Sequence, residues 1–185
     1  MKTTDKIEKH VDIAAPPARV WKALTDQHEF ESWFGVTLAG PFVVGAAVKG
    51  DFGDAVPPKD KRDEIQRKGG IEPADIKMPP PNSTFCVVEK MEKERLFSFR
   101  WIPFGIDASI DFANEPMTLV EFVLEKQGAG TRLTITESGF ERVPAHRRAR
   151  AFLMNDGGWA AQAQNLKTHV EKDAAKQSER HVESR

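Results

Sequence analysis

The sequence predicts an α+β fold in which a curved antiparallel sheet of six to seven strands surrounds one long C-terminal helix. Short segments with the two-residue periodicity of strands recur through much of the chain. Near the C-terminus, apolar residues recur with helical spacing over about 144–172. An apolar sheet face and an apolar helix stripe can bury each other, so these two observations predict one shared core.

The first strand and helix are expected at the N-terminus. Over 7–13, Ile7, Val11 and Ile13 alternate with polar residues, and only Lys9 interrupts the apolar side. Pro16 and Pro17 follow, and proline is tolerated in a first helical turn because that position needs no backbone N–H. We therefore expect a strand at 7–13 and a helix at 17–24.

A second short helix is expected at 27–34. Thr25 or Asp26 can cap its N-terminus, and Phe30, Trp33 and Phe34 form one apolar stripe before Gly35. Two strands should follow, at 36–38 and 46–52, separated by a turn at 40–41.

Four further strands are expected at 84–91, 96–102, 117–126 and 131–138. The charged turn 92–95 separates the first two, and the glycine-containing turn 127–130 separates the last two. Alternation places the aromatic side chains on one face and the charged ones on the other. The result is an antiparallel meander with an aromatic inner face.

The predicted C-terminal helix carries its apolar stripe on Phe152, Trp159, Ala163, Leu166 and Val170. Its interior contains the pair 157–158, Gly-Gly, and each glycine costs a helix roughly 1 kcal/mol relative to alanine. The missing side chains either leave room for a ligand or allow close approach to Trp33 or to the sheet. Residues 173–185 have no apolar stripe, and we expect a disordered charged tail there.

Residues 1–172 are expected to form a single domain with a proline-rich, charged insertion at 53–82. Such a long connection is uncommon in a compact domain unless it is a lid or a flexible insertion. Residues 59–68 can form a short surface helix. Two interpretations stay open, namely a lid over the cavity and a mobile segment with no role in binding.

Four stretches of the sequence together resemble a known superfamily. They are APPARVWKALTDQHEFESWFGV (15–36), ERLFSFRWIPF (94–104), TLVEFVLEKQGAGTRLTITESGF (118–140) and NDGGWAAQAQNLKTHV (155–170). On these stretches the chain is similar to the SRPBCC, or START-like, proteins, and within them to the branch of the heat-shock-protein-90 ATPase activator homologue, C-terminal domain type. The resemblance implies the helix-grip fold, also called Bet v-like, around an internal cavity. Members include lipid and hormone binders, polyketide cyclases and co-chaperones.

Composition and missing motifs argue against several function classes. The chain has 27 Lys and Arg against 28 Asp and Glu, so no global field favours nucleic acid or an anionic membrane. No apolar run approaches the roughly 18 residues of a membrane span. Motifs for nucleotide, zinc or thiol redox sites are missing, so we expect no metal and no cofactor. Cys86 is the only cysteine, and the N-terminus lacks an apolar signal region, which together favour a cytoplasmic location.

Glu137 is the candidate acid, base or ligand anchor. Strand alternation places it on the same face as Leu133 and Ile135, which should point toward the helix. A buried carboxylate is costly unless it is paired, and burial would raise its pKa. The alternative is a strand-end residue that reaches solvent or pairs with an arginine.

Aromatic side chains could line a small-molecule pocket beside Glu137. Ordinary core packing explains most of them equally well, although the indole N–H groups of Trp101 and Trp159 need partners when buried. The candidate ligand-binding residues are Trp33, Phe34, Phe99, Trp101, Phe122, Glu137 and Trp159.

The sequence favours a protein that binds a hydrophobic or aromatic small molecule, as a monomer or homodimer, without changing the ligand. One alternative is a co-chaperone-like protein with a protein partner. Another is an enzyme of the polyketide cyclase or dehydratase type, in which Glu137 transfers a proton. The strand assignments supply no second titratable group beside Glu137, so the sequence leans away from catalysis.

Overall fold

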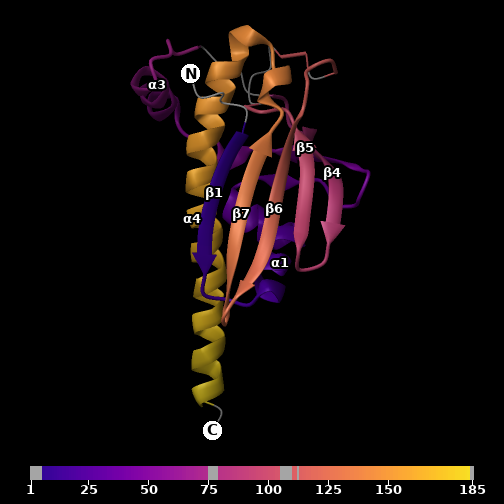
Figure 1. Ribbon diagram of the computed structural model, residues 1–185, viewed down its shortest axis with the longest axis vertical. Coiled ribbons are helices and arrows are strands. Elements are labelled where there is room, and N and C mark those ends of the chain that lie inside the picture. The colour runs from indigo at the N-terminus through magenta and orange to yellow at the C-terminus, as the bar shows by residue number, and fades with distance from the viewer. Residues whose placement is uncertain (1–5, 75–78, 105–109, 112, 184–185) are drawn as a thin grey trace.

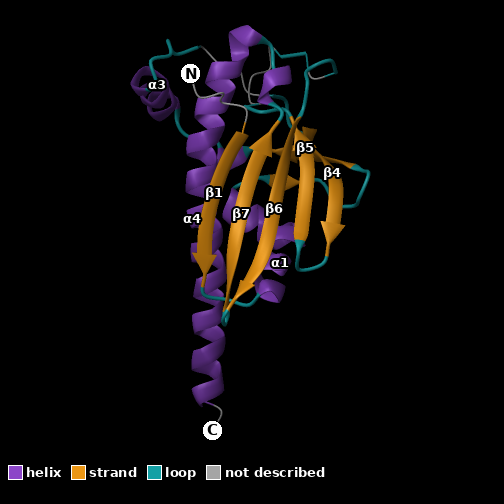
Figure 2. Ribbon diagram, viewed as in Figure 1, coloured by secondary structure: helices purple, strands orange, loops and turns teal. Residues whose placement is uncertain are grey.

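The computed structural model describes residues 6–74, 79–104, 110–111 and 113–183. One antiparallel sheet of seven strands, in the order β1-β7-β6-β5-β4-β3-β2, wraps around one long helix (Figure 1, Figure 2). This confirms the predicted α+β helix-grip fold. The elements in chain order are β1 (Lys6–Ile13), α1 (Pro17–Thr25), α2 (Gln27–Phe34), β2 (Thr37–Leu38), β3 (Ala47–Asp51), the 3-10 turn η1 (Gly53–Ala55), α3 (Lys59–Lys68), β4 (Ser83–Glu92), β5 (Leu96–Trp101), β6 (Thr118–Gln127), β7 (Gly130–Ser138), the 3-10 turn η2 (Phe140–Arg142) and α4 (Ala145–Glu183).

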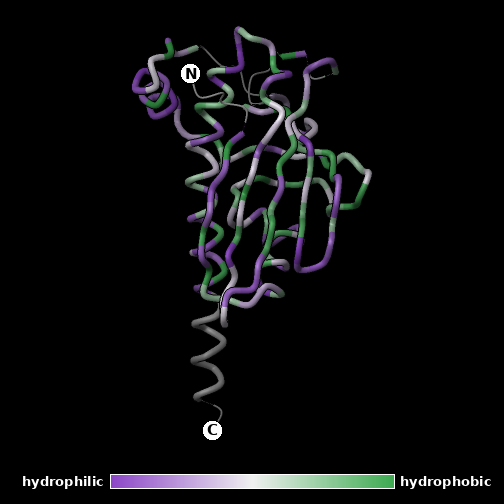
Figure 3. Tube along the Cα trace, viewed as in Figure 1, coloured by the Kyte–Doolittle hydropathy of each residue, from purple (hydrophilic) through white to green (hydrophobic). Residues whose placement is uncertain are grey.

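The inner face of the sheet follows the alternation in the sequence. On β7, Leu133, Ile135 and Glu137 are all fully buried, so the alternation places a carboxylate among apolar side chains as expected. Lys9, which interrupts the apolar side of β1, forms a salt bridge with Asp156 of α4, with 2.8 Å between Nζ and Oδ1. Figure 3 shows hydrophobic residues spread along the strands and α4, as a core shared between layers requires.

The short helices end where the sequence predicts. The Asp26 carboxylate caps α2 by accepting from the backbone N–H of Glu29 at 3.0 Å. Gly35 ends the helix with φ of 83°, a left-handed conformation that suits glycine. Phe30, Trp33 and Phe34 are all buried, so the apolar stripe of α2 belongs to the core.

Helix α4 packs against β1, α1 and α2. Figure 1 shows it running beside β1. Lys167 donates to the carbonyl of Asp12 at 2.6 Å, and Glu171 accepts from the N–H of Ala14 at 2.8 Å, so the helix is tied to the end of β1. The helix continues to Glu183, past its expected end near residue 172. Alanine, lysine, glutamine, glutamate and arginine together make up most of 173–183, and such strong helix formers can extend a helix that is already nucleated. The domain boundary stays a prediction.

The insertion carries α3, which confirms the helix predicted at 59–68. Arg150 of α4 holds the segment through two bonds, from Nε to Oε1 of Gln66 at 2.8 Å and from a terminal nitrogen to the carbonyl of Glu72 at 2.9 Å. Gly69 lies directly against Leu153, where an added Cβ would come within 2.3 Å of a leucine methyl. This part of the insertion is therefore fastened to α4.

Truncation of Leu166 tests the packing of α4. Leu166 is fully buried, so Leu166→Ala should lower the free energy of unfolding by about 2 to 5 kcal/mol. Gln164→Ala, at an exposed position of the same helix, should change it by less than about 0.5 kcal/mol. Urea denaturation of both variants measures the difference. Equal midpoints for the two would show that the apolar stripe is misassigned.

Candidate ligand-binding site

A pocket of about 990 Å³ opens beside α4. Four segments form it, namely the end of α2, residues 52–65 of the strand end and insertion, the segment that follows β5, and one side of α4. Its apolar walls include Trp33, Phe34, Trp101, Phe104, Met154 and Trp159. The insertion thus contributes to the pocket, together with elements that are distant in the sequence.

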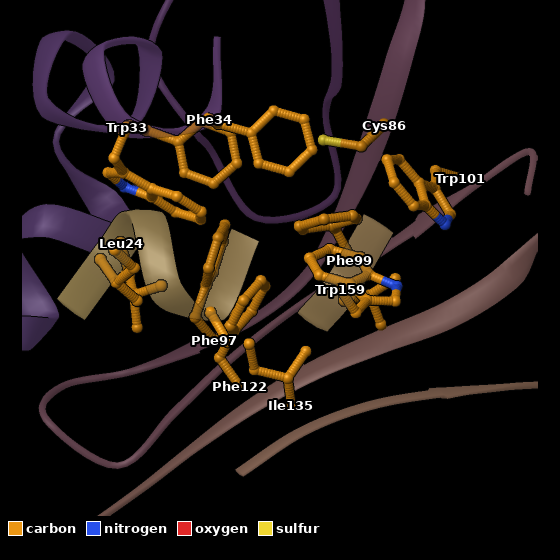
Figure 4. Close-up of a cluster of buried hydrophobic side chains, with 14 of the residues drawn as sticks. Leu24, Trp33, Phe34, Cys86, Phe97, Phe99, Trp101, Phe122, Ile135 and Trp159 are labelled. Carbon is orange, nitrogen blue, oxygen red and sulfur yellow. The ribbon is translucent and has the colours of Figure 1, made fainter. Parts of the chain in front are cut away.

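The structure divides the six predicted aromatic site residues into two groups. Trp33, Phe34, Trp101 and Trp159 line the pocket. Phe99 and Phe122 do not; both are fully buried in the aromatic core, with ring centroids 6.0 Å apart (Figure 4). For these two residues the structure agrees with the core-packing alternative. That the first group touches a ligand stays a prediction.

The four lining aromatics form one continuous surface. Trp101 and Trp159 lie with ring centroids 5.3 Å apart, and Phe34 contacts both rings at 6.3 and 6.2 Å. Trp33 meets Phe34 edge-on at 5.5 Å and donates its indole N–H to the carbonyl of Ala23 at 2.8 Å. Rings held by several neighbours present a fixed shape to the pocket.

Glu137 lies behind this aromatic surface and does not line the pocket. The side chain is fully buried, and its oxygens accept hydrogen bonds from four residues. Trp101 Nε1 donates to Oε1 at 2.8 Å, and Trp159 Nε1 donates to Oε2 at 2.7 Å. Thr118 Oγ1 bonds Oε1 at 2.6 Å, and the Asn155 amide nitrogen lies 3.0 and 2.9 Å from the two oxygens.

Three of these four partners can only donate toward Glu137. An indole nitrogen has no acceptor function. The orientation of Asn155 is fixed because its Oδ1 accepts from the backbone N–H of Phe104 at 3.1 Å, which leaves the amide nitrogen facing the carboxylate. Thr118 is different, since its hydroxyl can donate to Glu137 or, if Glu137 is protonated, accept from it and donate to the carbonyl of Trp101 at 3.4 Å.

Burial raises the pKa of Glu137, and the hydrogen bonds from Thr118, Trp101, Trp159 and Asn155 oppose that rise. Within the part of the chain that the structure describes, no cation pairs with this carboxylate. Both simpler sequence interpretations, contact with solvent and an arginine pair, are therefore wrong. Glu137 instead accepts hydrogen bonds from two tryptophans and one asparagine of the pocket wall.

The sequence analysis missed Thr118 and Asn155. Thr118 shares the inward face of β6 with Val120 and Phe122, and Asn155 lies one helical turn before Trp159. Periodicity could have placed both side chains on inward faces, but not beside Glu137. The signal was weak because neither residue type by itself indicates burial.

The pair Gly157 and Gly158 lies at the edge of the pocket. A Cβ added to either glycine would meet no atom within 4 Å. Close approach of the helix to Trp33 or to the sheet is therefore the wrong explanation for these glycines. The missing side chains leave open space that belongs to the pocket.

The described residues offer little support for a metal site, a membrane-spanning helix, a reactive thiol or an acid and base pair. Among them, no group of three or more metal-binding side chains is placed to hold an ion, and no helix is both long and apolar enough to cross a bilayer. Burial raises the pKa of the Cys86 thiol, so this cysteine stays protonated and unreactive. The partners of Glu137 include no second titratable group, so the described geometry supplies no acid and base pair.

Glu137→Gln tests the electrostatics of the buried carboxylate. A carboxyl whose pKa is higher in the folded state binds more protons there, so its contribution to the free energy of unfolding falls as pH rises above the unfolded pKa of about 4.3. Glutamine cannot accept from all four donors, and we expect a loss of about 1 to 3 kcal/mol. This loss should be larger at pH near 5 than near 8.

Urea unfolding of wild type and Glu137→Gln over this pH range measures the difference. Glu125→Gln, at an exposed position of β6, is the matched control and should show no comparable loss. The free energies of unfolding of the two proteins must be subtracted at each pH, because other carboxyls also contribute to the pH dependence. Glu171 and Asp12, for example, have lowered pKa values, so their contribution to stability rises with pH. A loss that grows toward high pH would contradict a raised pKa for Glu137.

Comparison with solved structures found the same fold in many proteins. DynU16, from the dynemicin biosynthetic locus, is 23% identical with a TM-score of 0.59, and the match covers 90% of this chain but only 47% of DynU16. MLL2253 from Mesorhizobium loti is 20% identical with a TM-score of 0.60, covering 90% of this chain and 97% of that one. The Aha1 dimer from Colwellia psychrerythraea is 17% identical with a TM-score of 0.55, covering 90% and 96%.

At these identities the likeness establishes the fold alone. Comparison with curated proteins found no significant match. A family model described as Activator of Hsp90 ATPase homolog 1-like protein matches residues 14–171. Because that match spans most of the sequence and agrees with the fold, this chain belongs to the family of Activator of Hsp90 ATPase homolog 1-like proteins.

Proposed function

We propose that this protein binds a hydrophobic or aromatic small molecule in the pocket beside α4. The observation that carries the proposal is the pocket itself, about 990 Å³ with walls of tryptophan and phenylalanine. Sites for small molecules commonly have about 300 to 1,000 Å³ and are lined by apolar and aromatic side chains. The aromatic surface of Trp33, Phe34, Trp101 and Trp159 is the contact surface in this proposal.

The fixed geometry of the walls supports binding. Both Trp101 and Trp159 are anchored through their indole nitrogens to one buried carboxylate. Gln162 adds a third anchor, because its amide donates to the carbonyl of Phe34 at 2.8 Å and so joins α2 to α4. A pocket whose walls are ordered before binding loses less entropy when the ligand enters.

The insertion forms one wall of the same site. Ala55, Val56 and Ile65 line the pocket, and the contacts of Arg150 hold the following segment against α4. This placement supports a role for the insertion as a cover of the site, in preference to a segment without a role in binding.

The two alternative functions have weaker support. For a cyclase or dehydratase, the candidate acid Glu137 is separated from the pocket by the side chains it holds, and its contacts supply no second titratable group. For a protein-docking role, the described surface exposes only two large hydrophobic side chains, Val43 and Val44. A patch of that size is small for an interface.

Gly158 allows the pocket to be filled without disturbing the core. Gly158→Ala should raise the free energy of unfolding by up to about 1 kcal/mol, since the methyl group meets no atom and alanine favours the helix. Gly158→Leu should weaken binding of the neutral aromatic probe phenyl-naphthylamine, which fluoresces when it enters an apolar site. Gln164→Leu, on the same helix but outside the pocket, should leave that binding unchanged.

Fluorescence titration of the probe into wild type, Gly158→Leu and Gln164→Leu measures the effect on binding, and urea denaturation of Gly158→Ala measures its effect on stability. Saturable binding by wild type that Gly158→Leu reduces and Gln164→Leu preserves supports the proposed site. If wild type does not bind the probe, or if both leucine variants bind as wild type does, the pocket is not the binding site.

A further inference from the structure

The charged side chains that line the pocket are all basic. Lys61 comes from α3, and His169 and Lys172 come from α4. Among the described residues, no aspartate or glutamate lines the pocket. The chain as a whole is slightly acidic, with a formal net charge of -1, so the sign of the pocket is a local property.

The two lysines have no close ion-pair partner in the part of the chain that the structure describes, although Lys61 attracts the Glu64 carboxylate at longer range. Both side chains are exposed, and neither forms a hydrogen bond or ion pair there. Glu64, close to Lys61 on α3, is bonded to Lys68 at 2.6 Å. The ammonium groups of Lys61 and Lys172 therefore keep their donors available at the pocket.

His169 contacts a carboxylate outside the lining, and other basic side chains already share that carboxylate. Glu29 lies 3.2 Å from Nε2 of His169, and it also pairs with Arg19 at 2.5 Å and Lys22 at 3.3 Å. One negative charge surrounded by three basic side chains does not reverse the sign of the local potential.

The two side-chain amides that border the aromatic surface, Asn155 and Gln162, are already engaged. Asn155 bonds Glu137 and the N–H of Phe104. The amide of Gln162 donates to the carbonyl of Phe34, and its oxygen accepts from Asn165 at 3.2 Å. The lysine ammonium groups are therefore the cationic donors that a ligand can use at the edge of the apolar surface, beside the hydroxyls of Ser32 and Thr168.

We infer that the ligand is an amphipathic organic anion, with an aromatic or acyl body and an acidic head group. The body packs on the aromatic surface, and the head group meets Lys61 or Lys172. This inference rests on the proposed function and adds the charge of the ligand to it. An acidic head group pairs with an ammonium group, whereas a cationic ligand would meet like charges.

Two probes with the same ring system test the inference. Anilinonaphthalene sulfonate carries a sulfonate, and phenyl-naphthylamine is its neutral counterpart. Both are titrated into wild type and the double variant Lys61→Gln with Lys172→Gln. The control is the double variant Lys90→Gln with Lys126→Gln, which makes the same change of charge at exposed sites outside the pocket.

The variant without the pocket lysines should bind the sulfonate probe about three- to tenfold more weakly than wild type, as expected for two partly solvated charge contacts. Its affinity for the neutral probe should not change, and the control should bind both probes as wild type does. High salt should shrink the loss, because salt screens exposed charges.

Two results would overturn the inference in distinguishable ways. If loss of the pocket lysines leaves the sulfonate affinity unchanged, or lowers it no more than the control does, the anionic head group is wrong. Saturable binding of the neutral probe would then leave the proposed function standing. If neither probe binds wild type, the proposed function fails and the inference fails with it.

Discussion

A single buried carboxylate links the layers of this fold. Glu137 stands on β7, and its four donors come from β5 (Trp101), the start of β6 (Thr118) and α4 (Asn155, Trp159). A charged group without these donors would be very costly in such a place, and the donors would in turn be unsatisfied without the carboxylate. The network therefore fixes how α4 sits relative to the middle of the sheet, and each partner depends on the others.

This constraint also shapes the pocket. Because both indole nitrogens point inward to Glu137, the rings of Trp101 and Trp159 are held at the border between core and pocket. The indole nitrogens of both tryptophans donate to Glu137 on the core side, so the ring faces that border the pocket are apolar. The charged groups of the pocket lie on α3 and α4, where Lys61 and Lys172 remain unpaired among the described residues. An apolar body and an acidic head group match these two parts of the site.

Local periodicity was sufficient to predict much of the fold and only part of the site. Alternation along β7 placed Glu137 on the inward face but left open whether its side chain reaches solvent. Buried indoles were expected to need hydrogen-bond partners, and only the three-dimensional structure shows that Glu137 is that partner. Phe99 and Trp101 share one strand face, yet one is core and the other pocket wall, because the sheet curves and α4 covers only part of it. The role of the insertion depends on long-range contacts such as Arg150 to Gln66, which no local pattern encodes.

The most direct test of this account is NMR of the tryptophan side chains, since the chain has 4 Trp and each gives one indole N–H signal. If Glu137 holds the pocket wall, the indole N–H signals of Trp101 and Trp159 shift together as pH crosses the raised pKa of Glu137, and both move in Glu137→Gln. Trp33, which donates to the carbonyl of Ala23, serves as the internal reference and should stay unchanged. Independent behaviour of Trp101 and Trp159, or signals that are unaffected by Glu137→Gln, would contradict the account.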